Sequence, residues 1–345
     1  MMQQFIFTNR AIVKKRGVEQ IDTSDSCGNT QNLRFGYLDV SKKKVALIPD
    51  PDIVQEHGVE SYETIDYKDS KQKGSSEWFN RIYAEMKEDK EKNDTLVFIH
   101  GFYCGFKCFI SNMEHLVTNY VDNPESSIGR VVGFCWPSNN NLLQYKNDRE
   151  DAHYAGAALA RGWIKLMQFF SEFVGVDNQC GKNIHLLAHS LGNAVFEKMI
   201  ASVLSSRYSS FGQVFKEVVL AAPDIQHDAF EKGNPLYHIN DFCERVHVYT
   251  HKSDDALRIS KYTKNFESRL GKNGPVRPFH IPSNVSIVDC SLIKDQRSIK
   301  EKLFDHWYYK NSQTVIDDIG LVLNGADSFE NRNYIANQNK FILKP

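Results

Sequence analysis

A serine held between small residues is the part of the chain whose residue types most clearly indicate chemistry. The segment from Asn183 to Val195 reads NIHLLAHSLGNAV, an apolar strand pattern that stops at Ser190 and continues as a helix pattern. Ala188 lies two residues before Ser190 and Gly192 lies two residues after it. So tight a strand-to-helix turn strains its central residue, needs small neighbours, and lifts the hydroxyl clear of both elements. The pattern predicts a nucleophilic serine, although an ordinary strand–turn–helix with an exposed serine fits it too.

A base and an acid must accompany such a serine, because a hydroxyl is a poor nucleophile until its proton is taken. The base is usually a histidine, which a buried carboxylate holds in the required tautomer. Where the serine lies on this kind of turn, the acid follows it along the chain and the histidine comes last. Asp254 follows an apolar run at 245–250, and His306 follows the last strand candidate. We therefore predict that Ser190, Asp254 and His306 form a catalytic triad.

Other residues could take the two supporting roles. Asp224 lies after the preceding strand candidate, and Asp255 is the direct neighbour of Asp254. Asp254 could also simply cap a helix that begins at Ala256, since aspartate is a favoured N-cap residue. The remaining histidine candidates come too early in the chain for the usual order: His238, His251 and His280.

The reaction of such a serine with a carbonyl creates an oxyanion, which needs two preorganised N–H donors. One donor is expected from Leu191, directly after the nucleophile, and the other from the loop after the apolar run 95–99, at Phe102 or Tyr103. Gly101 lets this loop turn sharply toward the substrate. Aromatic residues near the strand ends are candidates for an apolar substrate pocket, although they could equally belong to the core: Tyr103, Phe106 and Trp136.

The elements that must position these residues alternate along the chain. Short apolar runs typical of strands buried on both faces lie at 95–99, 131–136, 184–187, 217–222, 245–250 and 285–288. Helical patterns cover 75–90, 109–121 and 154–174. This alternation predicts an α/β fold with a doubly wound, mostly parallel sheet and helices on both faces. Ligands of such sheets bind beyond the carboxyl ends of the strands, where the predicted site residues fall.

We expect one α/β domain over residues 33–323. Short strand candidates at 33–40, 45–48 and 61–66 would extend its sheet. Residues 1–32 are expected to form a partly irregular N-terminal extension, and residues 324–345 a polar tail packed loosely on the surface.

Composition excludes several classes of function. The formal net charge of -1 indicates no nucleic-acid footprint. No stretch approaches the roughly 18 apolar residues of a membrane helix, and the apolar run Phe5–Phe7 is too short for the core of a signal peptide. We therefore expect a cytoplasmic protein.

The number and spacing of the cysteines also fit a cytoplasmic protein. An odd number of cysteines, seven, is scattered through the chain, which favours free thiols over a disulfide framework. Cys104 and Cys108 are the closest pair, but zinc would need two further ligands and none is evident. We expect neither a metal nor an organic cofactor.

Six short motifs in one order resemble a largely bacterial α/β-hydrolase family of unknown function, related by fold to lipases and esterases. They are FIHGF (98–102), WPS (136–138), LLAHSLGN (186–193), LAAPDI (220–225), SDDAL (253–257) and HWYY (306–309), and the resemblance covers roughly residues 33 to 310. It implies a serine hydrolase with Asp254 as its acid and His306 as its base. Leu191 stands where the family usually has methionine, and Tyr103-Cys104 replaces a loop that usually contains asparagine.

These observations favour a serine hydrolase that cleaves a carboxylic ester, with a small-molecule or lipid-like substrate. The same residues would also serve an amidase, a peptidase or a thioesterase, and the fold could act as a non-catalytic binding module. The oligomeric state does not follow from the sequence.

Overall fold

The computed structural model describes residues 3–24, 33–48, 75–88, 92–139, 141, 144–174, 180–206, 212–257, 268–295 and 305–345. The strand predicted at 61–66 lies outside these residues. Within them, no helix is long and apolar enough to cross a membrane.

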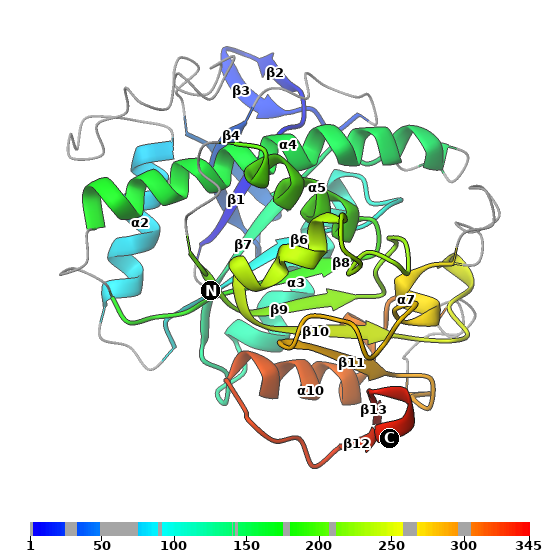
Figure 1. Ribbon diagram of the computed structural model, residues 1–345. Coiled ribbons are helices and arrows are strands. Elements are labelled where there is room, and N and C mark those ends of the chain that lie inside the picture. Colours follow the sequence, from blue (N-terminus) through cyan, green and yellow to red (C-terminus); the bar gives the residue numbers. More distant parts are fainter. Residues whose placement is uncertain are drawn as a thin grey trace.

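An 11-stranded sheet lies at the centre of the molecule (Figure 1). Its strand order is β12-β13-β11-β10-β9-β8-β6-β7-β1-β4-β5, and neighbouring strands are parallel from β13 through to β1. The apolar runs predicted as strands are β6 to β11, so the predicted doubly wound α/β architecture is confirmed. The strands are Gln4–Thr8 (β1), Arg34–Asp39 (β4), Lys44–Leu47 (β5), Asp94–Ile99 (β6), Ile128–Cys135 (β7), Ile184–His189 (β8), Phe215–Ala221 (β9), Cys243–Thr250 (β10), Val285–Asp289 (β11), Arg332–Ile335 (β12) and Lys340–Leu343 (β13), with Ile12–Lys15 (β2) and Val18–Ile21 (β3) in a separate pair.

Helices cover both faces of the sheet and create two apolar cores. The strands alternate their side chains between the two cores: on β8, Leu186 and Ala188 face one and Leu187 faces the other. The first core is covered by α2 (Ser75–Lys87), α4 (Tyr145–Phe169) and α5 (Gly192–Leu204), and the second by α3 (Phe106–Leu116), α9 (Tyr308–Asn311) and α10 (Gln313–Leu323). A short helix, α7 (Leu270–Asn273), follows β10 in the chain.

The N-terminal segment lies within the sheet, which differs from the expected extension over residues 1–32. Strand β1 pairs in parallel with β7 and antiparallel with β4, and all its residues are buried. The polar residue at its start, Gln4, is hydrogen-bonded to β7: the side-chain oxygen of Gln4 accepts the N–H of Val131 at 2.6 Å. The apolar run of this strand is too short to indicate a central position.

Helix α4 begins at Tyr145, nine residues before the predicted start at 154. The added turns present a buried face made partly of polar side chains, including Tyr145, Asp148 and Asp151. Apolar periodicity does not detect such a face, since its members are buried through hydrogen bonds rather than through hydrophobic contact.

The C-terminal segment also belongs to the sheet, whereas a loosely packed tail was expected over residues 324–345. Strands β12 and β13 form an antiparallel pair, and β13 extends the sheet beside β11. The buried guanidinium of Arg332 donates to both carboxylate oxygens of Asp318 on α10, at 2.8 and 2.7 Å. This bidentate ion pair anchors the segment to the domain.

The expectation of free thiols is wrong for one pair of cysteines. Cys104 and Cys108 form a disulfide between the loop after β6 and the first turn of α3. Cys104 lies just before the extended N-cap residue Gly105, and Cys108 is the third residue of α3. Disulfides are rare in the cytoplasm, so the cytoplasmic location stays a prediction.

Candidate active site

Ser190 lies in the sharp turn between β8 and α5. Its φ of 53° is in the left-handed region that residues other than glycine seldom adopt. Backbone hydrogen bonds hold this conformation: the Ser190 N–H donates to Ala221 at 3.0 Å, and the Asp224 N–H donates to the Ser190 carbonyl at 3.1 Å. The amide of Asn193 donates to the same carbonyl at 2.9 Å. The turn has the strained geometry that the sequence predicted.

Two glycines let neighbouring backbone pass very close to this turn. A Cβ atom added at Gly192 would lie 2.5 Å from the His100 carbonyl oxygen, and one added at Gly101 would lie 2.7 Å from the Ser190 Cβ. Both distances are far below an ordinary contact. The loop after β6 therefore lies directly against the serine, and any larger residue at Gly101 would push it away.

Asp254 and His306 meet through a short hydrogen bond, although 52 residues separate them along the chain. The His306 Nδ1 lies 2.7 Å from the Asp254 Oδ2, and Asp254 is fully buried. Because a carboxylate accepts here, Nδ1 carries the proton and Nε2 is free to act as a base. Burial raises the pKa of Asp254, while the charge and hydrogen bond of His306 lower it. The other carboxylate oxygen accepts the N–H of Leu257 at 2.9 Å, so Asp254 also has the capping role considered above.

His189, the residue directly before Ser190, contacts the loop that carries His306. Its Nε2 lies 3.1 Å from the His306 carbonyl oxygen, and the two rings are 4.8 Å apart. Burial lowers the pKa of His189 well below its usual range, so the ring is neutral and Nε2–H donates. Since His189 precedes Ser190 directly, this contact places the backbone of His306 beside the residue next to the predicted nucleophile.

The competing acids and histidines have other partners. Asp224 accepts the hydroxyl of Tyr145 at 2.7 Å and lies 3.4 Å from the Arg269 guanidinium. Asp255 is only partly buried beside Asp254. Of the histidines that came too early in the sequence, His251 lies 3.8 Å from Asp305, His238 pairs with Asp241 at the surface, and His280 is exposed.

Of the two predicted oxyanion donors, Leu191 directly follows Ser190, and Phe102 directly follows Gly101, which closely approaches Ser190. Among the described residues, no acceptor takes the backbone N–H of Leu191 or of Phe102. An N–H group without an internal acceptor at this turn is available to an oxyanion. Tyr103 has a φ of 56°, so the loop changes direction immediately after Phe102.

The aromatic pocket candidates have different surroundings. Trp136 is fully buried, donates its indole N–H to the His100 carbonyl at 2.8 Å and stacks on the His100 ring, so the expectation that it lines a substrate pocket is corrected. Phe106 is partly buried against the α3 side of the core. Tyr103 is 40% exposed.

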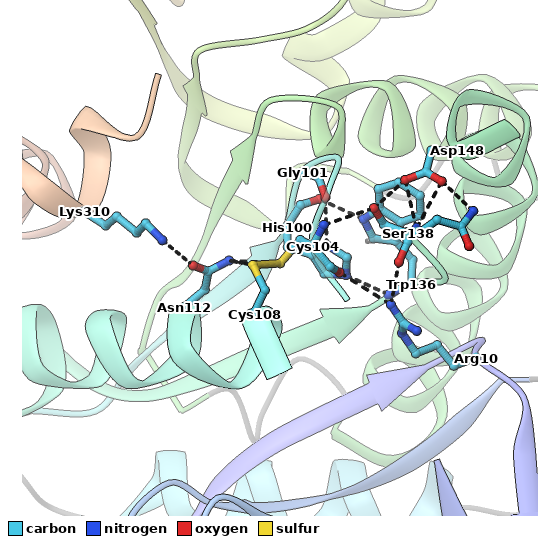
Figure 2. The surroundings of a disulfide bond; sticks show 11 residues. Arg10, His100, Gly101, Cys104, Cys108, Asn112, Trp136, Ser138, Asp148 and Lys310 are labelled. Atoms are coloured by element: carbon cyan, nitrogen blue, oxygen red, sulfur yellow. Dashed lines mark hydrogen bonds between the residues drawn. A yellow bond between two sulfur atoms is a disulfide. The ribbon is translucent and has the colours of Figure 1, made fainter. Parts of the chain in front are cut away.

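A polar network behind the loop after β6 was missed by the sequence analysis. It joins Arg10, Ser138 and Asp148 to Cys104 (Figure 2). Ser138 belongs to the WPS motif, which was the available signal, but its partners are distant in sequence. Within the described residues, no group of three or more histidine, cysteine, aspartate or glutamate side chains could hold a metal ion.

Comparison with known proteins agrees with the fold described above. Residues 72–322 match a family described as alpha/beta hydrolase of unknown function. An uncharacterized protein, alr1448, of Nostoc sp. (strain PCC 7120 / SAG 25.82 / UTEX 2576) is 21% identical over 257 residues, which cover 60% of this chain and 62% of the relative. The chain thus spans about three fifths of that relative's length. No solved structure matches the chain.

Proposed function

The chain belongs to the alpha/beta hydrolases of unknown function, the family its motifs resemble, and on this premise we propose that it is a serine hydrolase that cleaves a carboxylic ester. Ser190 attacks the carbonyl carbon while the His306 Nε2 takes the hydroxyl proton. The N–H groups of Leu191 and Phe102 hold the oxyanion. His306 then gives the proton to the departing alkoxide, which leaves an acyl group on Ser190, and water releases the acid by the reverse sequence of proton transfers.

One observation carries the proposal: the 2.7 Å hydrogen bond between the buried Asp254 and His306, on a loop that His189 joins to the strained serine. A buried aspartate that only capped a helix would not need a histidine partner. An imidazole with Nδ1 bound to a carboxylate has the tautomer that proton abstraction requires.

The test is hydrolysis of p-nitrophenyl esters of increasing acyl length by the purified protein. We expect turnover by the wild type and none above background by Ser190→Ala. Ser205→Ala is the matched control, because Ser205 is an exposed serine at the far end of α5, the helix that Ser190 precedes. Equal rates for the wild type and Ser190→Ala would refute the proposal.

The leaving group distinguishes the related chemistries. Anilide and thioester substrates with the best acyl chain separate an amidase or thioesterase from an esterase, because the same catalytic groups serve all three. Turnover of the anilide at the rate of the ester would replace the ester proposal by amide chemistry. A folded wild type that cleaves none of these substrates would favour the binding module.

A further inference from the structure

The loop that supplies the Phe102 N–H is held from behind through Cys104. The Cys104 N–H donates to the Ser138 hydroxyl at 3.3 Å, and its carbonyl lies 3.5 Å from the Arg10 guanidinium (Figure 2). Its sulfur is bonded to Cys108 on α3. Cys104 is therefore held through its N–H, its carbonyl and its side chain, two residues after the oxyanion donor.

Ser138 is the centre of this arrangement. It is 1% exposed, and its hydroxyl accepts from Cys104 while donating to the Asp148 carboxylate at 2.6 Å. Its carbonyl accepts from Arg10 at 3.0 Å. A hydroxyl that donates to a carboxylate is fixed in orientation, so its lone pair points at the Cys104 N–H.

Asp148 is fully buried and both its oxygens are occupied. In addition to Ser138, it accepts the backbone N–H of Asn139 at 3.0 Å and the Asn139 amide at 2.7 Å. Burial raises its pKa to about 6, although these hydrogen bonds lower it. In the described part of the chain no lysine or arginine forms an ion pair with it. A buried carboxylate without an ion pair is expensive, and apolar packing would stabilise the fold better.

The same helix also supports the donor residue itself. Tyr145 lies three positions before Asp148 on α4, which places both side chains on one face. The Tyr145 ring packs edge-to-face against the Phe102 ring at 5.1 Å. The first turn of α4 thus contacts the loop twice, directly at Phe102 and through Ser138 at Cys104.

We propose that Ser138 and Asp148 are positioning residues for the oxyanion loop, the loop after β6 that carries Phe102. Asp148 orients the Ser138 hydroxyl. This hydroxyl holds Cys104 and thereby aims the Phe102 N–H at the oxyanion. The inference rests on the proposed function and deepens it. Neither side chain touches the reacting atoms.

The test compares Ser138→Ala and Asp148→Asn with the wild type in two assays: p-nitrophenyl ester hydrolysis and the rate of Ser190 phosphonylation by a fluorophosphonate. Complete loss of an oxyanion donor slows catalysis about 10²–10³-fold, so a misaimed donor should slow kcat and phosphonylation by about 10- to 100-fold in Ser138→Ala. KM should stay almost unchanged, because the donor acts on the transition state. Asp148→Asn keeps one acceptor oxygen for the Ser138 hydroxyl and should be slowed less.

Ser126→Ala is the matched control. Ser126 is also buried and its hydroxyl accepts a backbone N–H, that of Ile128 at 3.1 Å, but it precedes the amino end of β7 whereas Ser138 follows the carboxyl end. We expect a loss of thermal stability in both alanine variants, larger in Ser138→Ala because that hydroxyl makes two hydrogen bonds, and slow phosphonylation only in Ser138→Ala. Equal phosphonylation rates for Ser138→Ala and the wild type would overturn the inference, as would equal slowing in Ser126→Ala.

Failure of the proposed function gives a different result. In that case the folded wild type takes up no phosphonate at all, and the inference fails with its premise. If Ser138→Ala does not fold, Asp148→Asn decides alone, because it preserves the side-chain shape. Wild-type kcat and phosphonylation rates in Asp148→Asn would overturn the inference. Slower rates with unchanged KM would support it.

Discussion

Replacing Gly101 by alanine should move the loop after β6 away from Ser190, the proposed nucleophile. The added Cβ would lie 2.7 Å from the Ser190 Cβ and 2.9 Å from the His189 carbonyl oxygen. Carbon atoms in contact normally stay about 3.5–4.0 Å apart, so the loop must move back by about 1 Å. The backbone at Gly101 is not in the left-handed region, so the effect is steric.

The expected loss follows from that displacement. A misplacement of about 1 Å in an active site can reduce the rate about 10²-fold. Overpacking of this kind costs about 1–3 kcal/mol of folding free energy, which leaves a domain of this size folded. We therefore expect Gly101→Ala to melt at a modestly lower temperature and to show about 100-fold lower kcat for ester hydrolysis.

Gly162→Ala provides the control for this prediction. A Cβ at Gly162 would meet its nearest atoms at 3.5 and 3.7 Å, which are ordinary contacts, and the residue lies inside α4. Alanine is preferred over glycine there by about 1 kcal/mol, so this variant should keep wild-type kcat and melt slightly higher. If Gly101→Ala turned over ester within a few-fold of the wild type, the loop would not approach Ser190 as described.

Three further predictions concern the histidine tautomer, a buried ion pair and the partly buried carboxyl group of Glu197. Asp254→Asn should lower kcat about 10⁴-fold without unfolding the protein, because the amide no longer fixes the His306 tautomer; steady-state kinetics beside a melting curve would check this, and an active variant would refute it. Arg332→Leu should cost about 3–5 kcal/mol in urea unfolding, since it leaves the buried Asp318 unpaired; a loss below about 1 kcal/mol would show that the pair does not anchor the C-terminal strands. Burial raises the pKa of Glu197 to about 7. Ionisation of Glu197 therefore destabilises the folded state above pH 7 and not below the usual carboxyl pKa. Glu197→Gln should raise the melting temperature at pH 8 and much less at pH 5. Equal shifts at both pH values would contradict the raised pKa of Glu197.

Apolar runs predicted the centre of the fold well because strands β6 to β11 are buried on both faces. The same pattern cannot detect elements that are buried through polar contacts. The start of α4 was missed because Asp148 faces inward through hydrogen bonds, and the C-terminal strands because the ion pair between Arg332 and Asp318 is invisible to local periodicity.

The part of the candidate site that was predictable is the order of its residues along the chain, which follows a general rule. The rule of serine, acid and histidine selected Asp254 and His306, and these two residues do meet. Positions that depend on three-dimensional neighbours were not predictable. Trp136 lies in the core, and the Ser138 hydroxyl bonds Cys104 of the loop after β6 and Asp148 of α4, which are distant in sequence.

The central claim is that Ser190 is a nucleophile activated by His306 and Asp254. Its most direct test is to react the folded protein with a fluorophosphonate and locate the adduct by intact mass and peptide mapping. We expect one phosphonate per chain, on the peptide that carries Ser190, and none in Ser190→Ala. An adduct on another residue, or a folded wild type that remains unmodified, would contradict it.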